Sequence, residues 1–326
     1  MFDLSSLGLS SFFSQQLDEH ACVARVSAVH RGEVELIAER GRLRARCPDA
    51  VVGDWVALEG ERVERVLNRR TLLSRKTPGR SSDAQVLAAN VDVVWVVTAV
   101  GPDLSLARLE RYLALAWDGG ASPVVVVNKI DRGPDAGIDE IEAAVPVHRI
   151  SASDGAGVAD LVTSVEPGQT VVMLGSSGVG KSTLLNRLTG ASAETREVRT
   201  ADDTGRHTTT RREMYVLPRF IVIDTPGLRE VGLWAGKRGI QSVFSEVESL
   251  AENCRFRDCA HGDEPGCAVA AEMPPERLER YRALMHEQAA AAERADAHAQ
   301  KAAGKRMGKM IREAKDWRSK RRGGNT

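Results

Sequence analysis

The segment GSSGVGKS, which starts at Gly175, constrains the fold of this chain more than any other feature. It matches the phosphate-loop pattern G-x-x-x-x-G-K-[ST] in full. It lies between the apolar run TVVML and the sequence STLLNRLTG, which has the character of a helix. A strand, a glycine-rich loop and a helix N-terminus in this order surround phosphate with backbone N–H groups. The predicted phosphate site comprises Gly175, Ser176, Ser177, Gly178, Val179, Gly180, Lys181, Ser182 and Thr183. In it, Lys181 reaches the outer phosphates and Ser182 is a ligand of Mg²⁺.

Further motifs follow the ends of other predicted strands and point to guanine. NKID follows PVVVV, SAS follows VPVHRI, and DTPG follows RFIVI. The Asp131 carboxylate can accept two hydrogen bonds from the edge of guanine, and the Ala152 N–H is expected to face the guanine oxygen. Asp224 is expected to hold Mg²⁺ through water, and the Gly227 N–H to sense a γ-phosphate. These motifs place the following residues at GTP: Asn128, Lys129, Ile130, Asp131, Ser151, Ala152, Asp224 and Gly227.

The order of these motifs is unusual, because the guanine reader NKID precedes the phosphate loop. The alternation of buried strands and helices predicts a doubly wound α/β domain, in which ligands bind at the carboxyl ends of strands. Such a pocket depends on where the strand ends lie in space and not on their order along the chain. We therefore predict a circularly permuted α/β P-loop GTPase domain over residues 76–238.

Two other regions flank this domain. Residues 21–75 contain short period-two segments separated by glycines, which predict an OB-fold barrel; a barrel without a nucleic-acid role fits the same pattern. Residues 1–20 form an N-terminal extension, and residues 239–326 a helical domain with a basic tail. The segment LLSRKTPGRSSDAQ, rich in serine, glycine and basic residues, is interpreted as a linker or mobile loop.

The helical region also contains a clustered set of metal-ligand residues. Cys254, Cys259, His261 and Cys267 have the spacing C-x₄-C-x-H-x₅-C. Three thiolates and one imidazole suit tetrahedral Zn²⁺, and four protein ligands leave no position for a catalytic water. We predict one structural zinc per chain; a redox cluster or unrelated cysteines are the alternatives.

Charge and hydropathy limit the kinds of partner and compartment that fit this chain. The 45 basic and 45 acidic residues cancel, but from Lys301 onward basic residues strongly predominate, which favours either a phosphate-rich partner or a merely solvated tail. No apolar run approaches the roughly 20 residues that span a bilayer, and the N-terminus is a poor signal peptide. We expect a cytoplasmic protein without a membrane partner.

The permuted order, the preceding barrel and the segment CRFRDCAHGDEPGC together resemble the ribosome small subunit-dependent GTPase A (RsgA) family. The resemblance extends from about Ala21 to the basic tail. It implies an OB-fold, a permuted GTPase domain and a zinc domain, and hydrolysis of GTP to GDP and phosphate. The implied partners are the immature 30S ribosomal subunit and its 16S rRNA, which the monomeric protein binds late in assembly and which stimulate hydrolysis.

The sequence also suggests how hydrolysis proceeds. Leu228 follows the DTPG glycine, where many GTPases have a glutamine that orients water. We expect slow hydrolysis by the free protein, with His207 positioning water; a plain loop histidine is the alternative. One of Thr208, Thr209 and Thr210 is expected to ligate Mg²⁺, and the sequence leaves open which. The segment after Gly227 leads directly into the C-terminal region, which predicts that the nucleotide signal leaves the domain there.

Two other functions fit the same motifs. One is a non-ribosomal switch or scaffold that binds GTP, and the other is an ATP-dependent RNA-binding enzyme. Asp131 argues against the second, because its carboxylate matches the donors of guanine, which adenine lacks.

Overall fold

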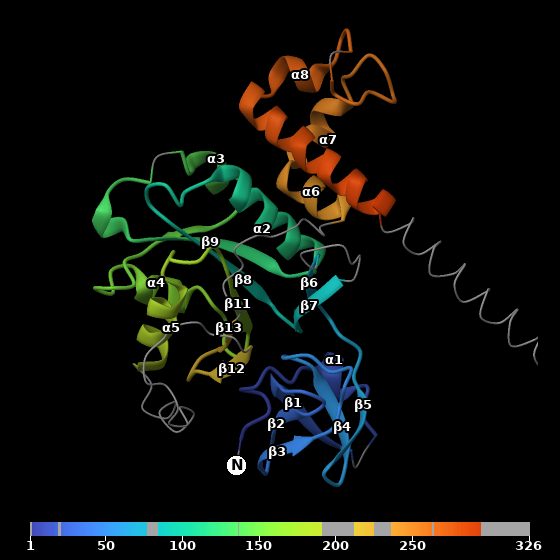
Figure 1. The fold of residues 1–326 in the computed structure, drawn as a ribbon, viewed down its shortest axis with the longest axis vertical. Helices are drawn as coiled ribbons and strands as arrows, with labels where there is room; N and C mark the ends of the chain where they lie inside the picture. The colour runs from blue at the N-terminus through green and yellow to red at the C-terminus, as the bar shows by residue number, and fades with distance from the viewer. Residues whose placement is uncertain are drawn as a thin grey trace, which may run out of the picture.

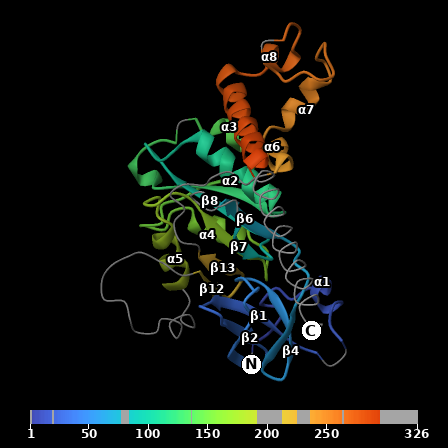
Figure 2. The same cartoon turned by 45° about the vertical axis from the view of Figure 1, so that its right-hand side comes forward.

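The computed structural model describes residues 2–18, 21–76, 84–135, 137–190, 212–224, 236–262 and 264–294. Figure 1 shows three parts along the longest axis, with the N-terminal strands at one end, an α/β layer in the middle and the C-terminal helices at the other end. Figure 2 shows the same succession from a second direction. Within the described ranges, no helix is long and apolar enough to cross a membrane.

The central sheet has the predicted parallel character. Its strands are β8 (Val93–Ala99), β9 (Ser122–Asn128), β10 (Val147–Arg149), β11 (Thr170–Leu174), β12 (Glu213–Val216) and β13 (Ile221–Asp224). They lie in the order β10-β9-β8-β11-β13-β12, and all neighbours are parallel except β12 and β13. Strands β8, β11 and β13 are buried along their whole length, which explains their continuous apolar sequences.

Helices cover both faces of this sheet. They are α2 (Leu106–Asp118), the 3₁₀ turn η1 (Ile130–Arg132), α3 (Asp139–Glu142), α4 (Val158–Thr163) and α5 (Lys181–Gly190). Strand β8 alternates between two cores: Val94 and Val96 pack with α2, whereas Trp95 and Val97 pack with α4 and α5. This doubly wound arrangement confirms the predicted α/β class and leaves the carboxyl ends of the strands for the loops that carry the nucleotide motifs.

The N-terminal part is a small antiparallel sheet that curls around its own core. Its strands are β1 (Cys22–Val29), β2 (Val34–Ala38), β3 (Gly41–Ala45), β4 (Trp55–Glu59) and β5 (Arg62–Val66). They pair in the order β3-β2-β1-β4-β5. Among the described residues no ladder joins β3 to β5, so a closed OB-fold barrel stays a prediction. We refer to these five strands as the barrel strands.

The N-terminal extension packs against the barrel strands. A short helix, α1 (Ser11–Ser14), carries Phe13, which is buried with Leu7 against Trp55. Phe13 and Trp55 have their ring centroids 5.9 Å apart. The extension therefore shares an apolar cluster with Trp55 of the barrel strands.

Two paired strands flank residues 77–83, where the sequence predicts a linker. Strands β6 (Leu72–Lys76) and β7 (Ala84–Ala89) pair antiparallel in a sheet of their own. Leu73 and Leu87 are buried in the core beneath α2. The linker interpretation was wrong for these strands, because their apolar residues bury against the nucleotide domain.

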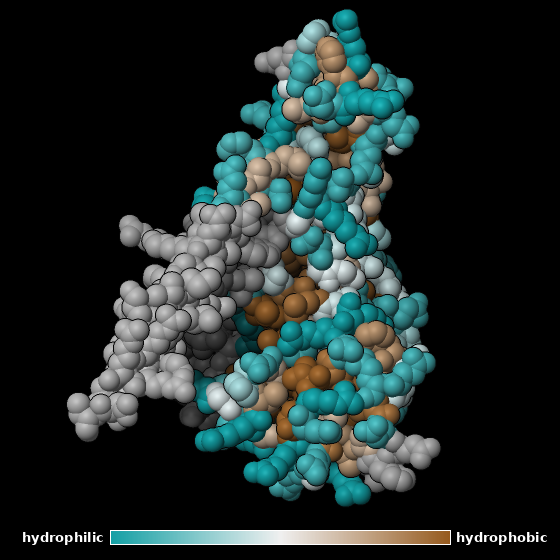
Figure 3. All heavy atoms as spheres, turned by 90° about the vertical axis from the view of Figure 1, so that its right-hand side faces the viewer, coloured by the Kyte–Doolittle hydropathy of each residue, from teal (hydrophilic) through white to brown (hydrophobic). Residues whose placement is uncertain are grey.

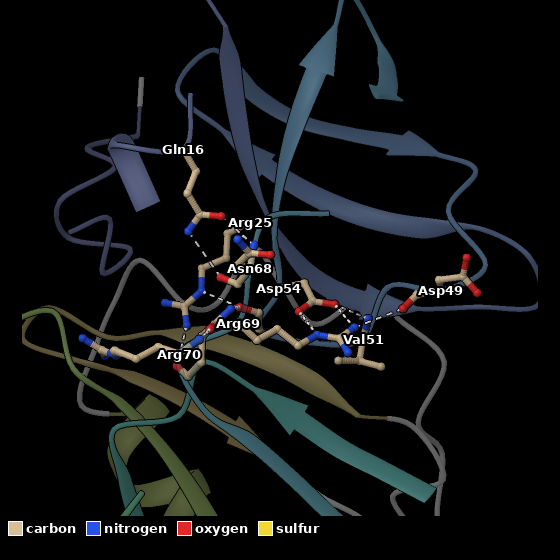
Figure 4. A network of polar contacts seen from close by, with 10 residues as sticks. Gln16, Arg25, Asp49, Val51, Asp54, Asn68, Arg69 and Arg70 are labelled. Atoms are coloured by element: carbon tan, nitrogen blue, oxygen red, sulfur yellow. Dashed lines mark hydrogen bonds and ion pairs between the residues drawn. The ribbon is translucent and has the colours of Figure 1, made fainter. Parts of the chain in front are cut away.

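In the described part of the chain, one β-bridge and a buried polar network join the barrel strands to the nucleotide domain. Strand β1 pairs with β12 through Ala28 and Glu213, which makes one continuous eleven-stranded sheet. Beside this junction lies Arg25, which is 1% exposed (Figure 4). Its Nη2 donates to Thr170 Oγ1 at 2.8 Å and to the Asn90 carbonyl at 3.2 Å. Arg25 also donates to the Leu7 carbonyl. Burial lowers the pKa of Arg25 to about 10.

A second buried charge fixes the loop that leaves the barrel strands. The fully buried Asp54 carboxylate accepts two hydrogen bonds from Arg69, both at 2.8 Å, and one from the Val51 N–H at 2.8 Å (Figure 4). The neighbouring Arg70 pairs with Asp92, whose other oxygen accepts from the Thr170 N–H at 2.8 Å. The barrel strands therefore dock at the start of β11, the strand that leads to the phosphate loop.

The C-terminal part lies over α2. Its helices are α6 (Lys237–Val243), α7 (Ser245–Ala251), α8 (Ala268–Glu272) and a helix over 275–294. A Cβ on Gly239 would lie 2.2 Å from the Ala114 carbonyl oxygen, so α6 can approach α2 this closely only with glycine there. Hydrophilic side chains cover much of the C-terminal part on the face drawn in Figure 3.

Candidate nucleotide site and metal centre

The phosphate loop connects β11 to the N-terminus of α5. Gly180 has a φ of 103°, and a Cβ there would lie 2.1 Å from Nδ2 of Asn128. This position therefore requires glycine for both its backbone conformation and its space. The loop brings the predicted residues from Gly175 to Thr183 to the carboxyl end of β11.

Lys181, the first residue of α5, folds back over the loop. Its Nζ donates to the carbonyls of Gly175 and Ser176, both at 2.7 Å, and the side chain is 8% exposed. Burial lowers the pKa of Lys181 to about 8, and the charge of Asp224 partly opposes this shift. Two neutral carbonyls are weak partners for a buried ammonium group, so a phosphate at the loop would offer Nζ a stronger acceptor.

Asn128 connects three strand ends. Its Nδ2 donates to the Val179 carbonyl at 2.8 Å, and its Oδ1 accepts from the Ala152 N–H at 2.9 Å. The side chain is 2% exposed. It thereby ties the NKID loop after β9 to the SAS loop after β10 and to the phosphate loop after β11.

The bond from Ala152 changes the role expected for this residue. The sequence predicts that the Ala152 N–H faces the guanine oxygen, but in the structure it supports Asn128. To bind guanine as well, this N–H would have to be shared between the guanine oxygen and Asn128 Oδ1, which would weaken its bond to Asn128.

The other NKID residues lie around the same mouth. Lys129 has a left-handed φ of 63°, and its Nζ donates to the Gly178 carbonyl at 2.7 Å. Asp131 lies in η1 with 39% of its side chain exposed, and Arg132 Nε lies 4.0 Å from its Oδ2. Its carboxylate is therefore accessible to a base that enters between the NKID and SAS loops.

Asp224 and Ser182, the two residues predicted to hold Mg²⁺, follow or end neighbouring strands of the sheet. Asp224 ends β13, the neighbour of β11, and is 5% exposed. Ser182 is in the first turn of α5. A carboxylate and a hydroxyl are oxygen ligands of the kind Mg²⁺ prefers, so both residues fit this ion. The predicted His207, Thr208, Thr209, Thr210 and Gly227 lie outside the described residues.

Two arginines that the sequence analysis did not single out support these loops. Arg187 on α5 donates to the carbonyls of Ala152 at 2.7 Å and Ser153 at 2.5 Å. Arg108 on α2 donates from Nη1 to Ser176 Oγ at 3.1 Å. Nothing in the sequence marks either contact, because each joins distant segments.

The four predicted metal ligands converge in the C-terminal part. The ligand atoms of Cys254, Cys259, His261 and Cys267 all lie within 4.8 Å of one another. Cys254 Sγ is 3.9 Å from Cys267 Sγ and 3.8 Å from His261 Nδ1. Zn–S bonds of about 2.3 Å in a tetrahedron place ligand atoms about 3.8 Å apart. The donor set and its spacing therefore fit one zinc ion, with no open position for catalysis.

Comparisons with known proteins agree with this geometry. The family model described as RsgA GTPase matches residues 66–234. The Small ribosomal subunit biogenesis GTPase RsgA of Streptomyces coelicolor is 44% identical, covering 88% of this chain and 86% of that protein. The protein of the same name from Opitutus terrae is 42% identical, covering 90% and 92%.

Two solved structures share the fold. The crystal structure of YjeQ from Thermotoga maritima is 26% identical with a TM-score of 0.61, covering 82% of this chain and 98% of that one. The structure of YloQ, titled a circularly permuted GTPase, is 22% identical with a TM-score of 0.60, covering 83% and 96%. The predicted permutation is therefore confirmed, and the chain belongs to the RsgA family of circularly permuted GTPases.

Proposed function

We propose that this GTPase binds the small (30S) ribosomal subunit and assists its late maturation, hydrolysing GTP to GDP and phosphate with stimulation by the subunit. The observation that carries the proposal is the Asn128 side chain, whose two hydrogen bonds join the loops predicted to hold guanine and phosphate. The relatives' names, which specify small ribosomal subunit biogenesis, support the choice of partner.

The barrel strands offer a surface for the 16S rRNA. Alternate residues of β3 and its continuation, Arg42, Arg44 and Arg46, are exposed on one side of an edge strand. Arg44 also pairs with Glu35 at 2.6 Å. Arginines in a row bind successive phosphates and make the affinity fall with salt. We propose that this row contacts rRNA together with the basic tail after Lys301.

Hydrolysis is proposed to depend on charge at the phosphates and on one positioned water. Lys181 would bind the outer phosphates, while Ser182 and Asp224 would hold Mg²⁺, which neutralises phosphate charge when bound. His207 stays the proposed residue for positioning water. Single-turnover hydrolysis with 30S subunits should slow strongly in His207→Ala, and an unchanged rate would exclude that role.

The remaining proposals concern the whole protein. We propose a monomer that acts in the cytoplasm, divided into residues 1–20, 21–75, 76–238 and 239–326 as the sequence predicts. The monomer should give one species near the 35.3 kDa of the chain in light scattering.

Cosedimentation tests the central proposal. The protein is mixed with purified 30S or 50S subunits in the presence of GDP or a non-hydrolysable GTP analogue. We expect it to pellet with 30S only, more strongly with the analogue. Equal pelleting with 50S, or none with 30S, would favour a non-ribosomal switch.

Asp131→Asn should loosen the preference for guanine over xanthine nucleotides, because it removes one acceptor.

A further inference from the structure

Helix α2 contacts the phosphate loop at its first turn. Arg108, its third residue, donates to Ser176 Oγ at 3.1 Å. The carbonyl of the same serine accepts from Lys181 Nζ at 2.7 Å. Ser176 is therefore held by two cations at once. When Lys181 turns from this carbonyl to a phosphate, one of the two contacts is lost and the one to Arg108 remains.

The next residues of α2 hold the C-terminal part. Glu110 is fully buried, and both of its carboxylate oxygens accept from Arg280 Nε at 3.0 Å. Its Oε1 also lies 3.4 Å from Arg277 Nη1. Arg277 in turn donates to the Val243 carbonyl of α6 at 3.1 Å, and its guanidinium lies 4.8 Å from the centre of the Phe244 ring. One carboxylate on α2 thus anchors both α6 and the helix over 275–294.

A second ion pair lies beside this cluster. Arg111 donates to Glu287 Oε2 from Nη2 at 2.9 Å and from Nε at 3.2 Å. Both side chains are about one-third exposed (34% and 31%). On α2, Arg108 therefore contacts the phosphate loop, whereas Glu110 and Arg111 contact the helix over 275–294.

The buried cluster of Glu110, Arg277 and Arg280 is better explained as fixing the orientation of the C-terminal helices on α2 than as stabilising the fold. Burial raises the pKa of Glu110, and Arg280 and Arg277 oppose this shift. Taking a carboxylate and two guanidinium groups out of water carries a desolvation cost that apolar residues would avoid. A buried ionic group of this kind fixes how two surfaces meet, since each hydrogen bond demands one direction.

We propose that α2 carries the nucleotide state from the phosphate loop to the C-terminal zinc-binding part, with Arg108 as a positioning residue that senses the loop through Ser176 and Glu110 as the anchor of the C-terminal helix. This route is proposed in addition to the one through the segment after Gly227 that the sequence predicts. It rests on the family's nucleotide site and is independent of ribosome binding.

Hydrogen exchange of the full-length zinc-loaded protein tests the route without ribosomes. The amide exchange rates of residues 275–294 are compared between the nucleotide-free protein and the protein bound to GDP. Wild type should show a difference of about fivefold or more, the lower end of ordinary coupling between two sites. In Arg108→Met this difference should disappear while GDP still binds.

Variants at the other end of the route complete the test. Glu110→Gln should also remove the difference, and Glu287→Gln, at a part-exposed pair, should reduce it without leaving a buried charge unpaired. Arg219→Met is the matched control. Its Nε donates to the Val165 carbonyl at 2.9 Å, beside the core of α4 and α5 and on the face of the sheet away from α2. It should keep the full difference. The proposal is overturned if wild type shows no difference at residues 275–294, or if Arg108→Met retains it.

Discussion

Asn128→Ala tests whether the three nucleotide loops depend on one side chain. The substitution leaves the Ala152 N–H and the Val179 carbonyl without their partner. Each buried polar group left unpaired costs about 1–3 kcal/mol, so the pair costs about 2–6 kcal/mol. In the nucleotide-free variant the loops can relax toward water. Nucleotide binding requires the original geometry, so much of the cost should return as weaker binding.

The expected loss follows from these values. If about 2–4 kcal/mol returns on binding, GDP affinity falls about 30- to 700-fold, since 1.4 kcal/mol corresponds to a factor of ten. Titration with a fluorescent GDP analogue measures this loss, and thermal unfolding of the same samples reports the stability.

Asn90→Ala is the matched control. Asn90 is also 2% exposed and also makes two bonds to backbone groups, at the opposite end of the sheet. Its φ of 56° makes alanine at least as costly for folding there. Asn90→Ala should lower the stability and leave GDP affinity unchanged. The reasoning is refuted if Asn128→Ala binds GDP within about threefold of wild type, or if both variants lose affinity alike.

Three further predictions concern other parts of the molecule. Because the pKa of Lys181 is about 8 in the free protein, its ammonium form declines above that pH, and GDP affinity should fall as the pH rises past 8. Calorimetry in buffers of different ionisation enthalpy should show that GDP binding near pH 8.5 is accompanied by proton uptake. Arg25→Met leaves acceptors on three segments unpaired, including Thr170 Oγ1; the free energy of unfolding should fall by about 3 kcal/mol, whereas exposed Arg42→Met should change it by less than about 0.5 kcal/mol. Cys267→Ser, or chelation of the metal, should abolish binding of one zinc per chain and reduce helical circular dichroism while GDP binding persists, and an unchanged spectrum would argue against a structural zinc.

The sequence predicted the nucleotide domain well because its strands are buried on both faces. Continuous apolar runs such as PVVVV have few other stable environments in a globular protein, and turn motifs at their ends then fix the site. The linker interpretation failed at β6 and β7, where a basic, glycine-rich centre outweighed the apolar ends. Leu73 and Leu87 gave the available signal, since both bury beneath α2.

The supporting arginines could not be predicted for a different reason. Arg187 bonds the carbonyls of Ala152 and Ser153, and Arg25 bonds the carbonyls of Leu7 and Asn90. Every residue has a backbone carbonyl, so the acceptor leaves no mark in the sequence. Only the folded chain shows which carbonyls a guanidinium can reach.

The buried position of Arg25 limits how this protein can be recombined with its relatives. A chimera that exchanges residues 21–75 moves the guanidinium into a new host, whose β11 must offer a hydroxyl at the position of Thr170. Conversely, an exchanged segment 21–75 that lacks this arginine leaves the acceptors of the host's nucleotide domain unpaired where the two domains meet. Successful exchanges should therefore require both sides of the seam to come from one parent, so that the two domains are inherited together although each has its own core.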